Sequence, residues 1–216
     1  MKKLCIFDLD GTLLDTLGTI SGYANEALEK NGIAPIEKNE YKYLVGKGAS
    51  NLVAGMLRYR GCYSEELFGK VFADYNEAYN KNTTRDTEVY PGIRELLDAL
   101  KAKSIRIAVV SNKPDFATRS VVAAFFGEGY LDEVRGQREG VPIKPDPTAV
   151  FEVMEMLGAG AEDCIYVGDT GVDMQTGRNA GLLTVGVLWG FREKDELIEN
   201  GADHVIAKAE ELLKYL

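Results

Sequence analysis

Two aspartates near the start of the chain, Asp8 and Asp10, have the spacing of a site that binds a cation and a phosphate. They directly follow residues 4–7, a continuous apolar run typical of a strand that is buried on both faces. Residues two apart on an extended chain point the same way, so both carboxylates can converge on one point. Gly11 and Thr12 then turn the chain, and we expect their backbone N–H groups to be free for a phosphate. Paired carboxylates are also the oxygen ligands that a divalent cation prefers.

Ser111 and Asn112 form a second candidate site, because they follow the apolar run 105–110 and precede a predicted helix. Helix N-termini carry unpaired N–H groups and positive potential, so this position suits a phosphate. The hydroxyl and the amide could add donors to that phosphate, or one of them could simply cap the helix. Both interpretations remain open from this segment alone.

A lysine and a second pair of acids complete the candidate site residues. Lys144 lies in the sequence Lys-Pro-Asp-Pro, a stiff loop from which it could neutralise a phosphoryl oxygen, although a solvated lysine fits there too. The apolar run 164–167 leads to Asp169, and Asp173 comes four residues later. If a helix begins near Gly171, both carboxylates lie on one side of its first turn. Asp169 could otherwise serve only as a helix cap.

The elements that must position these residues predict an α/β fold. Residues 1–16 and 90–216 alternate strand and helix candidates, which is typical of a Rossmann-like parallel sheet with helices on both faces. Ligands of such sheets bind at the carboxyl ends of the strands, so we expect the acids, Ser111 and Lys144 to meet there. The strand candidates are 4–7, 105–110, 164–167, 183–187 and 204–206, and the helix candidates are 93–103, 114–126, 147–157, 172–180 and 208–215.

Residues 17–89 show helical periodicity without a convincing strand, which predicts an α-helical domain inserted after the first strand. Its helix candidates are 17–31, 49–60 and 65–80. The last carries an apolar stripe, which we interpret as core packing rather than as a ligand surface. The stripe consists of Leu67, Phe68, Val71, Phe72, Tyr75 and Tyr79.

Composition limits the possible partners and the compartment. The 216 residues contain 25 Lys+Arg and 34 Asp+Glu, a net charge of −9 that argues against nucleic acid and membrane surfaces as partners. Cys5 and Cys164 fall in apolar runs and are expected in the core. Three cysteines and the absence of a signal peptide predict a reducing cytoplasm. The composition is compatible with a monomer or a homodimer.

In order along the chain, Asp8-x-Asp10-Gly-Thr, Ser111, Lys144 and Gly168-Asp169-x₃-Asp173 resemble the four motifs of the haloacid dehalogenase-like phosphohydrolase superfamily. The resemblance covers essentially the whole chain, and the helical insert resembles the small cap domain called type C1. Segments 45–49 and 110–114 are most similar to the phosphoglycolate phosphatase branch.

The resemblance implies a Mg²⁺-dependent phosphatase for a small phosphorylated metabolite, with 2-phosphoglycolate as the first choice. Asp8 would attack phosphorus, and Asp10 would exchange protons with the leaving group and with water. Mg²⁺ would be held by Asp8, the Asp10 carbonyl and Asp169, with Asp173 bound directly or through water. Gly11, Ser111, Asn112 and Lys144 would hold the phosphoryl oxygens. In the cap loop 46–51, Lys47 and Gly48 would contact an anionic leaving group, although a solvated Lys47 is equally compatible.

Two other activities remain open. A phosphatase for another small substrate, such as pyrophosphate or a sugar phosphate, needs the same site, and so does a β-phosphoglucomutase-like phosphosugar mutase. Asp10 argues against a dehalogenase, because halide leaves without a proton. Thr12 is more similar to hydrolases than the valine common in the mutase branch. A non-enzymatic binding protein would be expected to lack one of the motifs, and all four are present.

Overall fold

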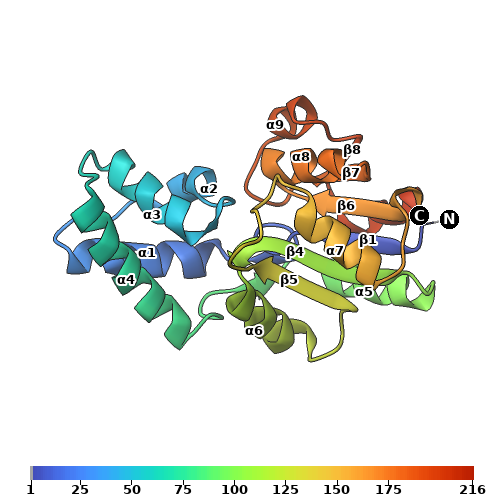
Figure 1. The fold of residues 1–216 in the computed structure, drawn as a ribbon, viewed down its shortest axis with the longest axis horizontal. Helices are drawn as coiled ribbons and strands as arrows, with labels where there is room; N and C mark the ends of the chain where they lie inside the picture. Colours follow the sequence, from blue (N-terminus) through green and yellow to red (C-terminus); the bar gives the residue numbers. More distant parts are fainter. Residues whose placement is uncertain (1) are drawn as a thin grey trace.

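A six-stranded parallel sheet forms the larger part of the protein, and a group of helices lies beside it (Figure 1). The computed structural model describes residues 2–216. The strands lie in the order β5-β4-β1-β6-β7-β8, and every neighbouring pair is parallel. The strands are β1 (Leu4–Phe7), β4 (Arg106–Pro114), β5 (Glu133–Gln137), β6 (Cys164–Gly168), β7 (Leu183–Val187) and β8 (His204–Ile206). The predicted α/β, Rossmann-like class is confirmed.

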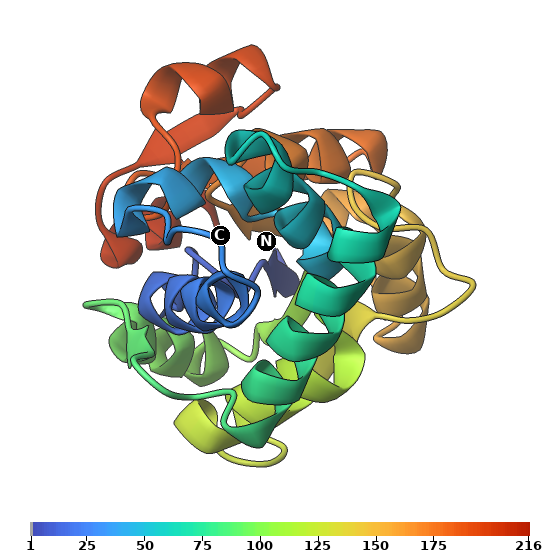
Figure 2. The same cartoon turned by 90° about the vertical axis from the view of Figure 1, so that its left-hand side faces the viewer.

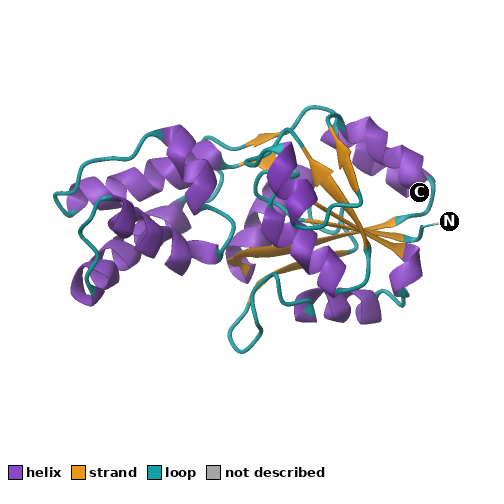
Figure 3. Cartoon of the chain, turned by 90° about the horizontal axis from the view of Figure 1, so that it is seen from above, coloured by secondary structure: helices purple, strands orange, loops and turns teal. Residues whose placement is uncertain are grey.

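Helices cover both faces of the sheet, as the continuous apolar strands require (Figure 3). Alternate residues of β1 point to opposite faces, so Cys5 and Phe7 pack in one core while Leu4 and Ile6 pack in the other. Cys5 and Cys164 are both buried, as predicted. The elements around the sheet are α5 (Ile93–Ala102), α6 (Asp115–Phe126), α7 (Thr148–Met156), α8 (Gly171–Asn179), α9 (Lys194–Glu199), and the 3₁₀ turns η2 (Ala161–Asp163) and η3 (Ala209–Tyr215).

The remaining helices form a group that faces the viewer in Figure 2. This group has an apolar core of its own. This helical group consists of α1 (Leu17–Lys30), the turn η1 (Lys38–Glu40), α2 (Tyr41–Leu44), α3 (Gly48–Tyr59) and α4 (Glu65–Lys81). The strands β2 (Leu14–Asp15) and β3 (Glu88–Val89) pair antiparallel where the chain enters and leaves the group. That ribbon adjoins the boundaries 16/17 and 89/90 chosen from the sequence.

Sequence reasoning missed several short elements for identifiable reasons. β5 reads Glu-Val-Arg-Gly-Gln and pairs only with β4, so as an edge strand it lacks the apolar run of the buried strands. In α9 only Leu197 is buried, which leaves no periodic stripe. Residues 208–215, expected as a helix, form the 3₁₀ turn η3 instead. Among residues 2–216, no helix is both long and apolar enough to cross a bilayer.

Candidate active site

The carboxyl ends of β1, β4 and β6 bring the predicted polar residues to one edge of the sheet. β1 lies between β4 and β6, so its end faces residues from both neighbours. Asp8 directly follows β1, Ser111 lies in the last part of β4, and Asp169 directly follows β6. The parallel pairing therefore gathers side chains that are separated by more than a hundred residues in the sequence.

Asp8, Asp169 and Asp173 form a buried acid cluster, in which one carboxylate oxygen of each residue lies within 4.8 Å of the others. Burial raises the pKa of Asp8 to about 7, against the opposing charge of Lys144. Burial also raises the pKa of Asp169 well above its usual value, and the charges of Asp173 and Asp8 add to this shift. Asp8 and Asp169 therefore need positive charge nearby in order to ionise together.

Local hydrogen bonds fix the orientation of the two later acids. Asp173 lies in the first turn of α8, where its Oδ2 accepts from the backbone N–H and the hydroxyl of Thr170 in a capping box. Asp169 Oδ1 accepts from the hydroxyl of Thr12 at 3.0 Å, and Oδ2 accepts from the backbone N–H of Phe191 at 2.8 Å. These contacts leave Asp173 Oδ1 facing the cluster.

Lys144 supplies the one buried positive charge in contact with the acid cluster among the described residues. Its Nζ lies 2.9 Å from Asp8 Oδ1 and 2.7 Å from Asp173 Oδ1. Burial disfavours the ammonium, but the charges of Asp173 and Asp8 outweigh it and raise the pKa of Lys144 well above its usual value. Lys144 precedes Pro145 through a cis peptide bond.

Asn112 holds the Lys144 loop in place. Its Oδ1 accepts from the Lys144 backbone N–H at 2.8 Å, and its Nδ2 donates to the Lys144 carbonyl at 3.2 Å. Nδ2 also donates to the carbonyl of Gly46, in the helical group, at 2.9 Å. Asn112, expected to bind phosphate, thus has acceptors for its amide within the protein and connects the sheet edge to the helical group.

The acid cluster fits a divalent cation. Asp8 Oδ1 is buried and has no hydrogen-bond partner among the described residues, although the Lys144 charge is close. Three carboxylates oppose one ammonium, and unbalanced buried charge is costly. Carboxylate oxygens are hard ligands of the kind that Mg²⁺ binds. The residues that the structure brings together are therefore suited to Mg²⁺.

The turn after Asp8 differs from the expectation of free amides. The Gly11 N–H donates to the Leu14 carbonyl at 2.9 Å, and the Thr12 N–H donates to the Leu9 carbonyl at 3.3 Å. The turn closes on itself in this way to lead into β2. Gly11 has φ +86°, and a Cβ at this position would lie 2.3 Å from Asp169 Oδ2. Glycine here allows Asp169 to approach the turn.

Asp10 is not part of the acid cluster, although its carboxylate was expected to converge with that of Asp8; it pairs with Lys113 instead. Lys113 Nζ lies 2.7 Å from Asp10 Oδ1 and 3.0 Å from Oδ2. Burial works against the ammonium, but the charge of Asp10 outweighs it and raises the pKa of Lys113. Sequence reasoning gave Lys113 no role, although it lies beside Ser111 and Asn112 in the sequence. The metal contact expected for Asp10 involves its carbonyl, so the side-chain pair leaves that prediction untested.

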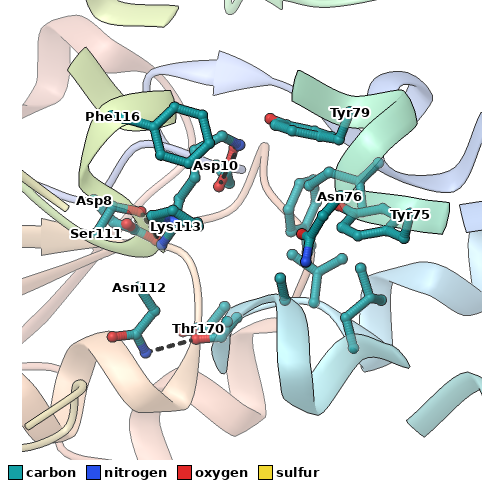
Figure 4. A pocket seen from close by; sticks show the side chains of 18 of the residues that line it. Asp8, Asp10, Tyr75, Asn76, Tyr79, Ser111, Asn112, Lys113, Phe116 and Thr170 are labelled. Carbon is teal, nitrogen blue, oxygen red and sulfur yellow. Dashed lines mark hydrogen bonds and ion pairs between the residues drawn. The ribbon is translucent and has the colours of Figure 1, made fainter. Parts of the chain in front are cut away.

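A small cavity of about 60 Å³ lies between this edge of the sheet and the helical group (Figure 4). Asp8, Asp10, Ser111 and Lys113 line its sheet side. Tyr75 and Tyr79 of α4 line the opposite side. The stripe to which they belong packs in the core of the helical group, as interpreted, and these two residues line the cavity as well. Both are buried, but they carry hydroxyl groups that pure core packing does not use, and this was the available signal. The other lining residues include Ile20, Val45, Gly46, Gly48, Leu52, Asn76, Asn112, Phe116, Thr170 and Phe191.

The two predicted cap residues lie in different places. Gly48 begins α3 and lines the cavity, with φ +82°. Lys47 is exposed and lines a neighbouring wider cleft of about 750 Å³, together with Arg58 and Arg192. The structure does not bring Lys47 into the cavity that contains Asp8, and its contact with a leaving group stays a prediction.

Residues 189–192, which sequence reasoning also missed, connect the acid cluster to the helical group. The Phe191 backbone donates to Asp169, while its ring is buried in the core of the helical group. The Arg192 guanidinium donates to the carbonyls of Lys42 and Val45 at the end of α2. A signal was available in the sequence Trp-Gly-Phe-Arg, which places an aromatic ring and a cation just beyond the end of β7.

Comparisons with known proteins agree with this geometry. The family model described as haloacid dehalogenase-like hydrolase matches residues 5–187. Proteins named phosphoglycolate phosphatase from Nitrosospira multiformis and Aquifex aeolicus are 32% and 30% identical, over 99% of this chain and 95% and 96% of theirs. A solved structure of a proposed phosphoglycolate phosphatase from Lactobacillus delbrueckii subsp. bulgaricus matches with a TM-score of 0.94 at 30% identity, covering 100% of this chain and 98% of that one.

Proposed function

The chain belongs to the haloacid dehalogenase-like hydrolase family and is a phosphoric monoester hydrolase, and we propose that it hydrolyses 2-phosphoglycolate with Mg²⁺ through an aspartyl-phosphate. Two observations support this choice of substrate. Relatives that carry the name phosphoglycolate phosphatase match nearly the whole chain. The cavity of about 60 Å³ is also far smaller than the roughly 300–1,000 Å³ of pockets for drug-sized ligands, which favours a small leaving group.

The observation that carries the proposal is the position of Asp8, which belongs both to the acid cluster and to the wall of the cavity. One of its oxygens has no hydrogen-bond partner among residues 2–216. A carboxylate in this position can attack a phosphorus atom held in the cavity and become the covalent carrier of the phosphoryl group. Ser111 can donate its hydroxyl to a phosphoryl oxygen, and Lys144 offsets negative charge at the same place.

Asp10 lines the same cavity and is the candidate acid and base. In its protonated form it would give a proton to the departing alkoxide, and as the resulting carboxylate it would take a proton from the water that attacks the aspartyl-phosphate, which restores the acid. Its carboxylate is held by Lys113, so the group stays directed into the cavity between these two steps.

Asp8, Asp169 and Asp173, with the Asp10 carbonyl, would hold Mg²⁺. When bound, the ion supplies positive charge that offsets the buried carboxylates and the phosphoryl oxygens. The apolar side chains on the helical side of the cavity, such as Ile20 and Leu52, limit the water that can reach the site.

Steady-state kinetics across a panel of substrates test the proposal. The panel comprises 2-phosphoglycolate, pyrophosphate, sugar phosphates and nucleotides, each with Mg²⁺ and with EDTA. We expect the highest kcat/KM for 2-phosphoglycolate and loss of turnover in EDTA. A higher kcat/KM for pyrophosphate or a sugar phosphate would contradict 2-phosphoglycolate as the substrate and identify that compound as the better candidate. Interconversion of sugar phosphate isomers without phosphate release would replace hydrolysis by mutase activity.

A further inference from the structure

Lys113 and Tyr79 place an ammonium and a hydroxyl close together at one part of the cavity. An ammonium has three N–H donors, and two of those on Lys113 are directed at Asp10 Oδ1 and Oδ2, 2.7 and 3.0 Å away. Tyr79 is only 5% exposed, yet its hydroxyl has no hydrogen-bond partner among the described residues. Figure 4 shows this hydroxyl directed towards Lys113 and Asp10, and Lys113 Nζ lies 5.2 Å from the centre of the Tyr79 ring.

Such a pair of donors indicates a missing acceptor. A buried hydroxyl without a partner is costly, and most buried polar atoms in proteins have one. Much of the surrounding wall is apolar, with Ile20, Leu52 and Phe116 among the lining residues. Lys113 is also the only lysine or arginine among the described residues that line the cavity. A small group entering this region can therefore contact the Lys113 ammonium and the Tyr79 hydroxyl next to Asp10, and Asn76 and Asn80 of α4 also line the cavity.

We propose that Lys113 and Tyr79 form a subsite for a second oxyanion, the carboxylate of the leaving group. This inference rests on the proposed function, in which a small phosphate monoester reacts at Asp8. One carboxylate oxygen can accept both the third N–H of Lys113 and the O–H of Tyr79. The ammonium favours an anion over a neutral group of the same size, because charge-assisted hydrogen bonds are about twice as strong as neutral ones.

This subsite would select substrates with a carboxylate, using Lys113 from the sheet and Tyr79 from α4. Lys113 lies near the end of β4, two residues after Ser111, so the phosphoryl and carboxylate contacts come from the same strand. Lys47, the lysine that the sequence favoured for this task, is exposed on the neighbouring cleft. The two lysines can therefore be separated by experiment.

The test compares 2-phosphoglycolate with 2-hydroxyethyl phosphate, in which a neutral CH₂OH replaces the carboxylate. The measured quantity is the ratio of kcat/KM for the two substrates. Tyr79→Phe leaves the Lys113–Asp10 pair intact, and we expect it to lower this ratio about 10-fold, chiefly through KM for 2-phosphoglycolate. Lys113→Met is expected to lower the ratio further and also to reduce kcat for both substrates, because Asp10 loses its partner.

Matched controls come from exposed residues of the helical group. Tyr63→Phe removes a hydroxyl that donates to Glu65, and Lys70→Met removes an ammonium paired with Glu66 on the surface of α4. Both are expected to keep the wild-type ratio. Lys47→Met is assayed beside them, and thermal melts show whether each variant folds. If Lys113→Met does not fold, the Tyr79→Phe result decides.

The outcomes separate the subsite from the proposed function. A wild type that prefers 2-phosphoglycolate, with Tyr79→Phe and Lys113→Met keeping that preference, overturns the subsite and leaves the proposed function intact. Loss of the preference in Lys47→Met alone assigns the carboxylate to the exposed loop and also overturns the subsite. A wild type that hydrolyses both substrates equally well contradicts the substrate proposal and the subsite together.

Discussion

Phe191 donates its backbone N–H to Asp169 Oδ2 at 2.8 Å while its ring is buried in the core of the helical group. One residue thus connects a carboxylate of the acid cluster to helices that the chain builds more than a hundred residues earlier. Arg192, the next residue, donates to the carbonyls of Lys42 and Val45 in the same group. Any displacement of the helical group would therefore act on the segment that orients Asp169.

Phe191→Ala is expected to weaken both the fold and the site. The ring is 4% exposed, and Phe→Ala in a core lowers the free energy of unfolding by about 3–5 kcal/mol. We also expect a higher Mg²⁺ concentration for half-maximal activity. Without the ring, the backbone N–H that donates to Asp169 is no longer anchored in the core of the helical group. Urea unfolding and Mg²⁺ titration of activity measure the two effects. Phe151→Ala, at a half-exposed ring on α7, is the control. An unchanged Mg²⁺ requirement in a destabilised Phe191→Ala would disprove the connection.

Lys144→Met should be strongly destabilising. Removing the ammonium leaves the buried carboxylates of Asp8 and Asp173 without a positive partner. Breaking a buried ion pair in this way lowers the free energy of unfolding by about 3–5 kcal/mol. The loss should be smaller in Mg²⁺ than in EDTA, because the ion replaces part of the missing charge. Urea unfolding in both buffers measures it, with Lys70→Met as the control. Equal stability of wild type and Lys144→Met in EDTA would contradict the charge balance described here.

The stability of the metal-free protein should depend on pH through Asp8. Its pKa is raised to about 7 by burial, from about 3.9 in an unfolded chain. Between these values the folded state binds the extra proton, so the contribution of Asp8 to stability is present below about pH 4 and is lost as the pH rises through about 7. In EDTA, Asp8→Asn should therefore raise Tm relative to wild type at about pH 8 and by less at about pH 5.

Mg²⁺ should act in the same direction as this substitution. Because binding requires deprotonated carboxylates, the ion should raise the Tm of the wild type more at about pH 8 than at about pH 5. Asp86→Asn, at an exposed position outside the cavity, serves as the matched control. A difference between wild type and Asp8→Asn that is constant across this pH range would show that Asp8 is not the responsible group.

Gly11→Ala should disrupt Asp169 specifically. The new Cβ would lie 2.3 Å from Asp169 Oδ2, and the residue has φ +86°, which costs a non-glycine residue roughly 1–2 kcal/mol. Gly181→Ala is the matched control, since Gly181 has φ +72° and open space around its Cβ. Both variants should lose stability, but only Gly11→Ala should lose kcat. Similar kcat values for the two variants would show that the close contact with Asp169 has no catalytic consequence.

The buried strands could be predicted from the sequence because both of their faces are covered. Residues 4–7 and 183–187 match β1 and β7 residue for residue. The edge strand β8 also matches the predicted residues 204–206, because its short sequence His-Val-Ile is still rich in β-forming residues. β5 could not be found in the same way, because an edge strand with one partner tolerates Glu, Arg and Gln. Short surface helices such as α9 carry little periodic signal because few of their residues are buried; in α9 only Leu197 is.

The acids of the candidate site were visible in the sequence because each pair occurs within a few residues of a strand end. The roles of Lys113, Tyr79 and Phe191 were not, since each depends on contacts between distant segments. Lys113 and Asp10, which form an ion pair, are 103 residues apart in the sequence, and Phe191 and Asp169, which share a hydrogen bond, are 22 residues apart. The turn amides were misjudged because hydrogen bonds within the turn, such as that from Gly11 to Leu14, are set by the local path of the chain.

The role of Asp8 is tested most directly by trapping the covalent intermediate. Enzyme and 2-phosphoglycolate are mixed with Mg²⁺, quenched in acid within the first turnover, and digested for peptide mass spectrometry. The account predicts an acid-stable, hydroxylamine-sensitive phosphoryl group on the peptide that contains Asp8, and none in Asp8→Asn, which should also be inactive while folding normally. A phosphoryl group on another residue, or turnover by Asp8→Asn, would contradict it.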